Sequence, residues 1–173
     1  MKLFFQDEGR FGRIDNKASC WVPQKARATV GSQIIREYTY AYTAVCPETG
    51  ENFSLILPYA NEAYMDVFME DFSKEYSKYR VIMIMDSASW HTGDKAKKWD
   101  NIVPCFQPPY SPELNPVEQI WHHIREFYQF KNYTFKSMNE VDEKLSVALS
   151  ELDNDTVKSI TLYNWIQNSL IAV

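Results

Sequence analysis

The stretch Val81-Ile82-Met83-Ile84-Met85-Asp86 is a run of five apolar residues that ends at a carboxylate. Such a run is typical of a strand buried on both faces of a sheet. Before it, residues 61 to 79 place apolar side chains at three- and four-residue spacing, which predicts an amphipathic helix. Because a helix is the usual crossover between parallel strands, this part of the chain predicts an α/β fold.

A second apolar run lies upstream, at residues 2 to 6, and ends at Asp7. It predicts another buried strand. Between the two runs, residues 34 to 46 are rich in β-branched and aromatic types, and residues 47 to 50 have the composition of a turn. Residues 52 to 57 then suit the returning strand of a hairpin.

The proline-rich stretch from residue 107 to 116 lies between the apolar run at 81–85 and the next long helix. It holds four of the eight prolines, which predicts an ordered, non-helical loop. Asn115 suits the N-cap of the helix that follows, and Pro116 suits its first position. Further elements are expected towards the C-terminus: a short helix at 95–99, a strand at 102–106, and amphipathic helices at 137–152 and 155–170.

This order of elements is that of a ribonuclease-H-like domain, an α/β fold with a mixed sheet of about five strands flanked by helices. We expect one such domain over residues 1–173, with its core at about 1–130 and helices at 137–170. In that layout the first and fourth strands are neighbours. Asp7 and Asp86 would then emerge at the same edge of the sheet, where Glu118 from the following helix could join them.

Three converging carboxylates are typical of a site for Mg²⁺, which prefers oxygen ligands. A pair of such ions can activate the attacking oxygen and stabilise the leaving oxygen of a phosphodiester. Each residue also has a plainer explanation. Asp7 and Asp86 could be turn residues after strands, and Glu118 could close a capping box at the start of its helix.

The net charge of −5 has the wrong sign for a protein whose whole surface binds phosphate. Any nucleic-acid contact is therefore expected to be local, at a basic cluster comprising Arg10, Arg13, Lys17, Lys25 and Arg27. No apolar run is long enough to span a bilayer, so a membrane location is not expected. The three cysteines form no Cys-x-x-Cys pair, which argues against a thiolate zinc site and favours reduced thiols in the cytoplasm.

Two longer motifs resemble the second and third catalytic blocks of mariner-like DDE transposases, in their bacterial insertion-sequence branch. They are Asp86-Ser-Ala-Ser-Trp-His91 and Pro108-Pro-Tyr-Ser-Pro-Glu-Leu-Asn-Pro-Val-Glu118-Gln-Ile-Trp121. The first block is similar to Asp7-Glu8, Arg10-Phe11-Gly12 and Cys20-Trp21-Val22-Pro23. The resemblance covers roughly residues 1 to 130. Ser87 stands where the family usually has Asn, and a family glycine near Lys25 is replaced.

The resemblance implies that Asp7, Asp86 and Glu118 are catalytic and bind two Mg²⁺ or Mn²⁺ ions. The enzyme would cut double-stranded DNA at transposon ends and join the 3′ hydroxyl to target DNA, with TA targets expected. A homodimer would hold the two ends. Helix-turn-helix modules precede the catalytic domain in the family and are absent from residues 1–173, so a separate DNA-binding portion is expected. The site of action would be the bacterial cytoplasm, at the nucleoid.

Five further residues are candidates for supporting or DNA-binding roles: His91, Arg10, Asn115, His122 and Arg125. His91 could contact phosphate or orient a metal-bound water, or be a plain surface histidine. On a helix, His122 and Arg125 share the face of Glu118. Asn115 would fix the start of that helix. Trp121 falls on its apolar stripe, which indicates a core residue.

Two other functions fit the same residues. A plain ribonuclease-H-like or resolvase-like nuclease would keep the fold and the metals but would not join DNA. A catalytically inactive transposase remnant would bind DNA or a partner only. The proline-rich third block argues against the first alternative, and the intact triad argues against the second.

Overall fold

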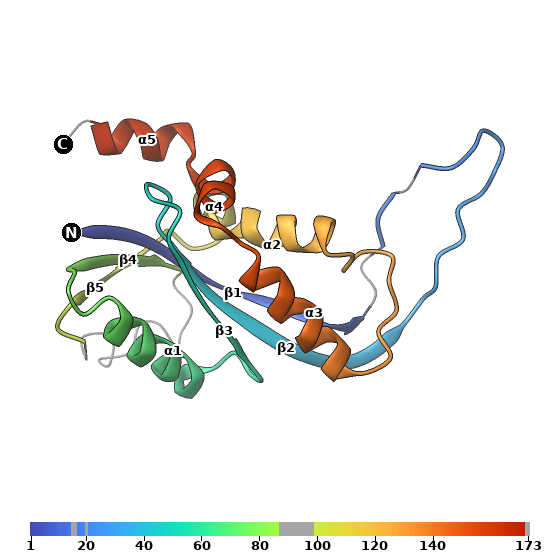
Figure 1. Cartoon of the computed structure of the whole chain (residues 1–173), viewed down its shortest axis with the longest axis horizontal. Coiled ribbons are helices and arrows are strands. Elements are labelled where there is room, and N and C mark those ends of the chain that lie inside the picture. Colours follow the sequence, from blue (N-terminus) through green and yellow to red (C-terminus); the bar gives the residue numbers. More distant parts are fainter. Residues whose placement is uncertain (15–16, 20, 87–98, 172–173) are drawn as a thin grey trace.

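The computed structural model describes residues 1–14, 17–19, 21–86 and 99–171 (Figure 1). One sheet contains five strands in the order β3-β2-β1-β4-β5. The strands are β1 (Lys2–Ile14), β2 (Ile34–Val45), β3 (Asn52–Leu57), β4 (Val81–Met85) and β5 (Ile102–Phe106). The helices are α1 (Glu62–Glu75), the 3₁₀ turn η2 (Pro112–Leu114), α2 (Val117–Phe127), α3 (Met138–Ser150), α4 (Asn154–Thr161) and α5 (Asn164–Ile171).

The sheet is mixed. Strand β1 pairs antiparallel with β2 and parallel with β4, where Phe5 lies opposite Ile84. Strands β4 and β5 are also parallel, and β2 and β3 form the expected antiparallel hairpin. The prediction that the first and fourth strands are neighbours is therefore confirmed, as is the ribonuclease-H-like class with its five-stranded mixed sheet.

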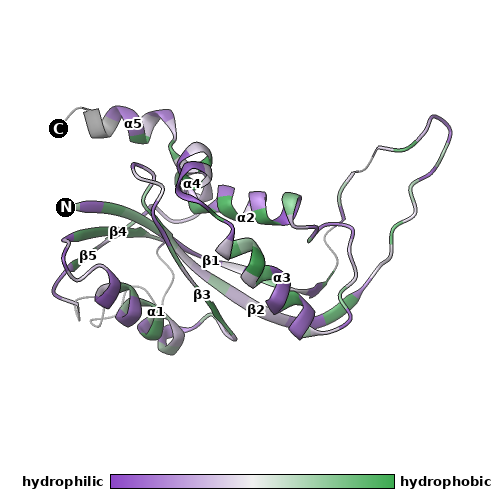
Figure 2. Ribbon diagram, viewed as in Figure 1, coloured by the Kyte–Doolittle hydropathy of each residue, from purple (hydrophilic) through white to green (hydrophobic). Residues whose placement is uncertain are grey.

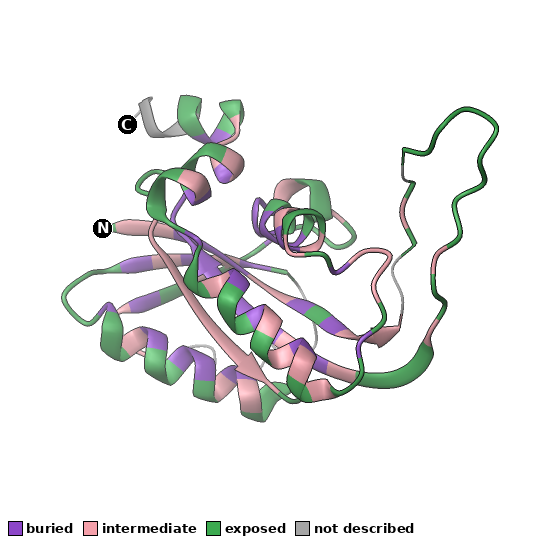
Figure 3. Cartoon of the chain, turned by 45° about the vertical axis from the view of Figure 1, so that its right-hand side comes forward, coloured by how far each residue is buried: buried purple, intermediate pink, exposed green. Residues whose placement is uncertain are grey.

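Helices cover both faces of the sheet. Helix α1 packs on one face, where Phe68 and Phe72 meet Phe4 of β1 in a fully buried cluster. Helices α2 and α3 lie on the other face, where Ile120 and Leu145 are fully buried (Figures 1 and 3). Figure 2 shows hydrophobic and hydrophilic residues alternating around α1, while β4 is hydrophobic along its length. Both patterns match the sequence-based expectation of an amphipathic crossover helix and a doubly covered strand.

Strand β1 differs from its prediction because it continues to Ile14, so Asp7 lies inside a strand instead of after one. The reason is the antiparallel partner: β2 pairs with β1 residue by residue, with Asp7 opposite Thr43 and Phe11 opposite Thr39. The hydrogen-bonded ladder, not the apolar run, sets the length of this strand.

The C-terminal region also differs. The single helix predicted for 155–170 is two helices, α4 and α5, because Leu162 adopts a non-helical ψ of 80°. Leu162 and Tyr163 pack against the core at this break, and Ile166 of α5 is 1% exposed. Burial of these apolar side chains outweighs the continuous helix that the periodicity predicts.

Four smaller features of the fold bear on the sequence-based predictions. The proline-rich loop contains the short turn η2, so it is not wholly non-helical. Most of the helix predicted at 95–99 lies outside the described residues. Lys25, near the position where the family has glycine, has φ of 71°, in the left-handed region that favours glycine. Among the described residues, no helix is long and apolar enough to cross a membrane.

Candidate active site

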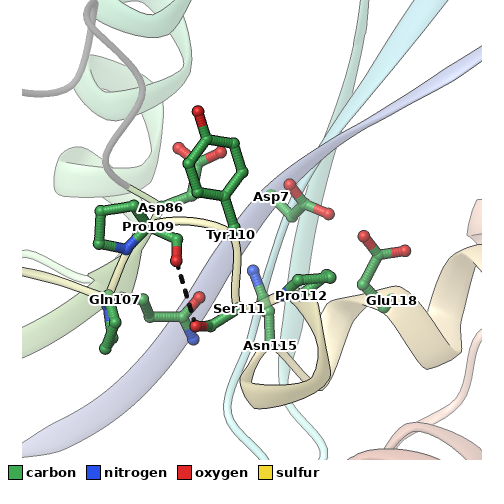
Figure 4. Close-up of a pocket in the computed structure, with 10 residues that line it drawn as sticks. Asp7, Asp86, Gln107, Pro109, Tyr110, Ser111, Pro112, Asn115 and Glu118 are labelled. Carbon is green, nitrogen blue, oxygen red and sulfur yellow. Dashed lines mark hydrogen bonds between the residues drawn. The ribbon is translucent and has the colours of Figure 1, made fainter.

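A pocket of about 400 Å³ lies where β1, β4 and the start of α2 approach one another (Figure 4). It brings the three predicted carboxylates, Asp7, Asp86 and Glu118, into one lining, with Asp7 between the other two in Figure 4. The remaining lining residues come from the proline-rich loop: Gln107, Pro108, Pro109, Tyr110, Ser111, Pro112 and Asn115. Residues distant in sequence therefore share one cavity.

Asp7 is the most enclosed of the three carboxylates. It is partly buried on β1, and its Oδ2 accepts a hydrogen bond of 2.8 Å from the indole Nε1 of Trp121. The pKa of Asp7 is raised to about 7, chiefly by burial and also by the nearby charges of Glu118 and Glu8, while the Trp121 hydrogen bond opposes the rise. An ionised Asp7 is costly in this setting, and a bound cation would relieve that cost.

Asp86 follows β4 directly, and its side chain is exposed at the pocket rim. The backbone of the loop is tied to this strand end, since the N–H of Gln107 donates to the carbonyl of Met85 over 2.9 Å. The side-chain amide of Gln107 in turn donates to the carbonyl of Leu114 (3.1 Å). The proline-rich loop is thus held against the end of the strand that carries Asp86.

Glu118 is an exposed residue in the first turn of α2. Asn115 fixes that turn: its Oδ1 accepts from the N–H of Val117 (3.1 Å), and its Nδ2 donates to the carbonyl of Gln6 (3.0 Å). The helix is assigned from Val117, so Pro116 takes the N-cap place expected of Asn115, although Asn115 still supplies the capping bond. The backbone N–H of Asn115 donates to Pro112, so it is not the partner that a capping box with Glu118 requires.

The three carboxylates line one pocket, but their oxygens are farther apart than the ligands of a bound metal ion would be. In the part of the chain that the structure describes, no three His, Cys, Asp or Glu side chains stand close enough to hold an ion. The donor set nevertheless suits a hard cation, because it consists of carboxylate oxygens with no thiolate or imidazole among them. Two of the three carboxylates, Asp86 and Glu118, are exposed side chains on rotatable stems.

A second pocket of about 400 Å³ lies further along β1 and is basic. Its lining residues are Arg10, Gly12, Ile14, Lys17, Tyr38, Arg125 and Lys131. The guanidinium of Arg10 lies over the Tyr38 ring at 4.7 Å, and that of Arg125 lies over the Phe11 ring at 5.1 Å. Burial lowers the pKa of Arg125, while the charges of Glu118 and Asp7 raise it. Arg125 therefore lines the basic pocket and also interacts with the charges of the acidic one.

The two histidines predicted to support the site are not seen among the described residues that line it. His122 is exposed, and its Nε2 lies 3.8 Å from Oε1 of Glu126, so its contact is with the solvent-facing side of α2. This contact gives no sign of the pocket-facing role expected from its helical spacing. His91 lies outside the described residues.

Sequence reasoning missed the polar role of Trp121. This residue is 2% exposed, as expected of a core side chain, but its N–H also reaches Asp7. Gly9 was the sequence signal for a large side chain packed beside Asp7, because it lies two residues after Asp7 and so on the same face of β1. A Cβ at Gly9 would lie 2.7 Å from the Trp121 ring, so only glycine leaves room for the indole here.

Comparison with known proteins places these features in a family. The family model described as DDE superfamily endonuclease matches residues 2–142. An uncharacterised protein of Sinorhizobium fredii, y4pE/y4sA, is 33% identical over 135 residues, which are 76% of this chain and 99% of the relative.

Two solved structures show the same fold. The catalytic domain of Mos1 mariner transposase is similar with a TM-score of 0.66 at 15% identity, covering 91% of this chain and 74% of that one. The Mos1 mariner paired-end complex with Mn gives a TM-score of 0.67 at 18% identity, covering 91% and 51%. The chain thus spans about half the length of the Mos1 chain in that complex. With the family model matching most of its length, this chain belongs to the DDE superfamily endonuclease family.

Proposed function

We propose that this chain is the catalytic domain of a transposase, which cuts DNA at the ends of a mobile element and joins the freed 3′ hydroxyl to target DNA. One observation carries the proposal: Asp7, Asp86 and Glu118, from three separate elements, line a single pocket. Membership of the endonuclease family supports cleavage of phosphodiester bonds. The fold shared with a mariner transposase supports the transposition reaction.

The same three carboxylates would hold Mg²⁺ or Mn²⁺, two ions being expected. Asp7 would contribute from a rigid strand, and the exposed side chains of Asp86 and Glu118 would rotate towards it. When bound, the ions would activate the attacking oxygen and stabilise the leaving oxygen of the phosphodiester. The similar Mos1 complex was solved with Mn, which supports the choice of cation. The proline-rich loop would form the opposite wall and limit how the DNA backbone enters.

The basic pocket would hold the DNA backbone beside the cutting site. Four cationic side chains line this one cavity in a chain whose net charge is −5: Arg10, Lys17, Arg125 and Lys131. Such a concentration of Lys and Arg is what phosphate contact requires. Arg125 would contribute to both pockets, since its guanidinium interacts with the charges of Glu118 and Asp7.

The partners proposed for the chain follow from the reaction. Two transposon ends would be held by a homodimer, and insertion would occur at TA targets. Recognition of the end sequences would come from a separate DNA-binding portion. We place the reaction in the bacterial cytoplasm, at the nucleoid.

The test is an assay that separates cutting from joining. Labelled DNA from the borders of the element that carries this gene would be incubated with the protein, Mn²⁺ and a plasmid target. We expect end cleavage and labelled plasmid with the wild type, and a loss of both of about 10³-fold or more in Asp86→Asn. Glu113→Gln removes an exposed carboxylate from the neighbouring loop and should leave activity unchanged.

Other outcomes would replace the proposal. Cleavage without any labelled plasmid would indicate a plain nuclease of the ribonuclease-H or resolvase kind. DNA binding with neither cleavage nor joining, in both Mg²⁺ and Mn²⁺, would indicate an inactive remnant.

A further inference from the structure

The helix that carries Glu118 is attached to the strand that carries Asp7 at two polar points. Asn115 donates to the carbonyl of Gln6 over 3.0 Å, and Trp121 donates to Oδ2 of Asp7 over 2.8 Å. Glu118 stands midway between Asn115 and Trp121 in the chain. These two contacts therefore fix the position of its helix turn relative to Asp7.

We infer that Trp121 is a positioning residue for the carboxylate site, and that its indole N–H holds one oxygen of Asp7 so that the other is presented to the pocket. The inference rests on the function proposed above. The indole is an N–H donor that cannot accept a bond or carry charge at neutral pH. It can therefore orient a carboxylate without competing with it for a cation.

The packing around the indole leaves it one orientation. The side chain is 2% exposed, its ring meets the Phe11 ring edge-on at 5.9 Å, and Gly9 faces it with no Cβ. A ring held on all sides aims its N–H in a fixed direction. Asp7 is thus oriented from the core side, in the way that outer-shell partners commonly orient metal ligands.

The indole hydrogen bond affects which oxygen of Asp7 would bind a cation. Because Oδ2 already accepts a bond from Trp121, Oδ1 is the oxygen more available to a cation in the pocket. Without the indole bond, the carboxylate would keep its hydrogen bond with the Glu8 backbone but would lose this preference. A metal would then have to order the carboxylate itself when it binds.

The test compares Mn²⁺ affinity in the full chain by titration calorimetry. Trp121→Phe keeps a buried aromatic ring but removes the N–H donor together with part of the ring volume. Trp165→Phe is the control, because Trp165 is a partly exposed tryptophan whose ring packs edge-on against Phe5, with ring centroids 6.2 Å apart. We expect Mn²⁺ affinity to fall about 10- to 100-fold in Trp121→Phe, the range seen for outer-shell partners, and to stay within about 2-fold in Trp165→Phe.

A merely structural role gives a different result. Trp121→Phe would then unfold at lower urea concentration but bind Mn²⁺ as tightly as the wild type, and the inference would be overturned. If the wild type itself binds no Mn²⁺, the proposed function fails, and the inference fails with it. Equal Mn²⁺ affinity in wild type and Trp121→Phe overturns the inference alone.

A second measurement needs no variant to fold. The wild type has five tryptophans, and each gives one indole N–H signal in a ¹H–¹⁵N spectrum. Saturation with Mg²⁺ should shift the assigned Trp121 signal more than that of Trp165. An unmoved Trp121 signal in a wild type saturated with Mg²⁺ would overturn the inference.

Discussion

Asp7 is the residue at which fold stability and the proposed function oppose each other. Its pKa is raised from 3.8 to about 7, chiefly by burial, so the folded protein holds the proton more tightly than the unfolded chain does. The contribution of protonated Asp7 to the free energy of unfolding is fully present below pH 3.8, and it is lost as the pH rises through about 7. A cation at the site would reverse this effect by favouring the ionised form.

The prediction at this scale concerns Asp7→Asn without metal. Asn cannot ionise, so at pH 8 the variant should be more stable than the wild type, by about 2–4 kcal/mol at most for a shift of this size. Below pH 4 the advantage should disappear. Urea unfolding at pH 3.5 and pH 8 in chelator would measure it, with Glu113→Gln as the exposed control. A variant that is less stable than the wild type at pH 8 would show that the burial cost is not realised.

At the scale of elements, the join between β1 and α2 depends on Asn115. This side chain is 3% exposed and serves two elements at once, as donor to Gln6 and acceptor from Val117. Asn115→Ala leaves a buried carbonyl and a buried N–H without partners. Each such group costs about 1–3 kcal/mol, so we expect a loss of about 2–4 kcal/mol in unfolding free energy.

Urea unfolding of Asn115→Ala against Gln119→Ala would check this expectation. Gln119 is an exposed neighbour on the same helix, and its truncation should change stability by less than about 0.5 kcal/mol. Mn²⁺ affinity should also fall in Asn115→Ala, because Glu118 is carried on the helix turn that Asn115 secures. Unchanged stability in Asn115→Ala would mean that water replaces both bonds.

At the scale of the whole molecule, charge is distributed unevenly over an acidic chain. Arg10→Ala removes one cation from the basic pocket, and Lys158→Ala removes one exposed cation from α4. The net charge changes equally in both. We expect Arg10→Ala alone to weaken DNA binding several-fold and to lower the slope of log K against log salt by about 1. Fluorescence anisotropy over a salt series measures both quantities, and equal losses in the two variants would refute a local DNA path.

Much of this fold could be predicted from hydrophobic pattern alone. The run at 81–85 is strand β4 at the predicted bounds, and the hairpin and α1 fall close to theirs, because buried faces impose a period on the sequence. Boundaries set by partners could not be predicted. Strand β1 is extended by pairing with β2, and the helix expected at 155–170 is broken where Leu162 and Tyr163 meet the core.

For the candidate site, too, the sequence determined the choice of residues and the tertiary structure determined their arrangement. Motif and residue type were enough to select Asp7, Asp86 and Glu118, because hard-cation chemistry requires carboxylates and these follow or begin predicted elements. That they line one pocket depends on the parallel pairing of β1 with β4 and on the docking of α2. The bond from Trp121 to Asp7 joins residues 114 positions apart, and only tertiary packing brings such a pair within 2.8 Å.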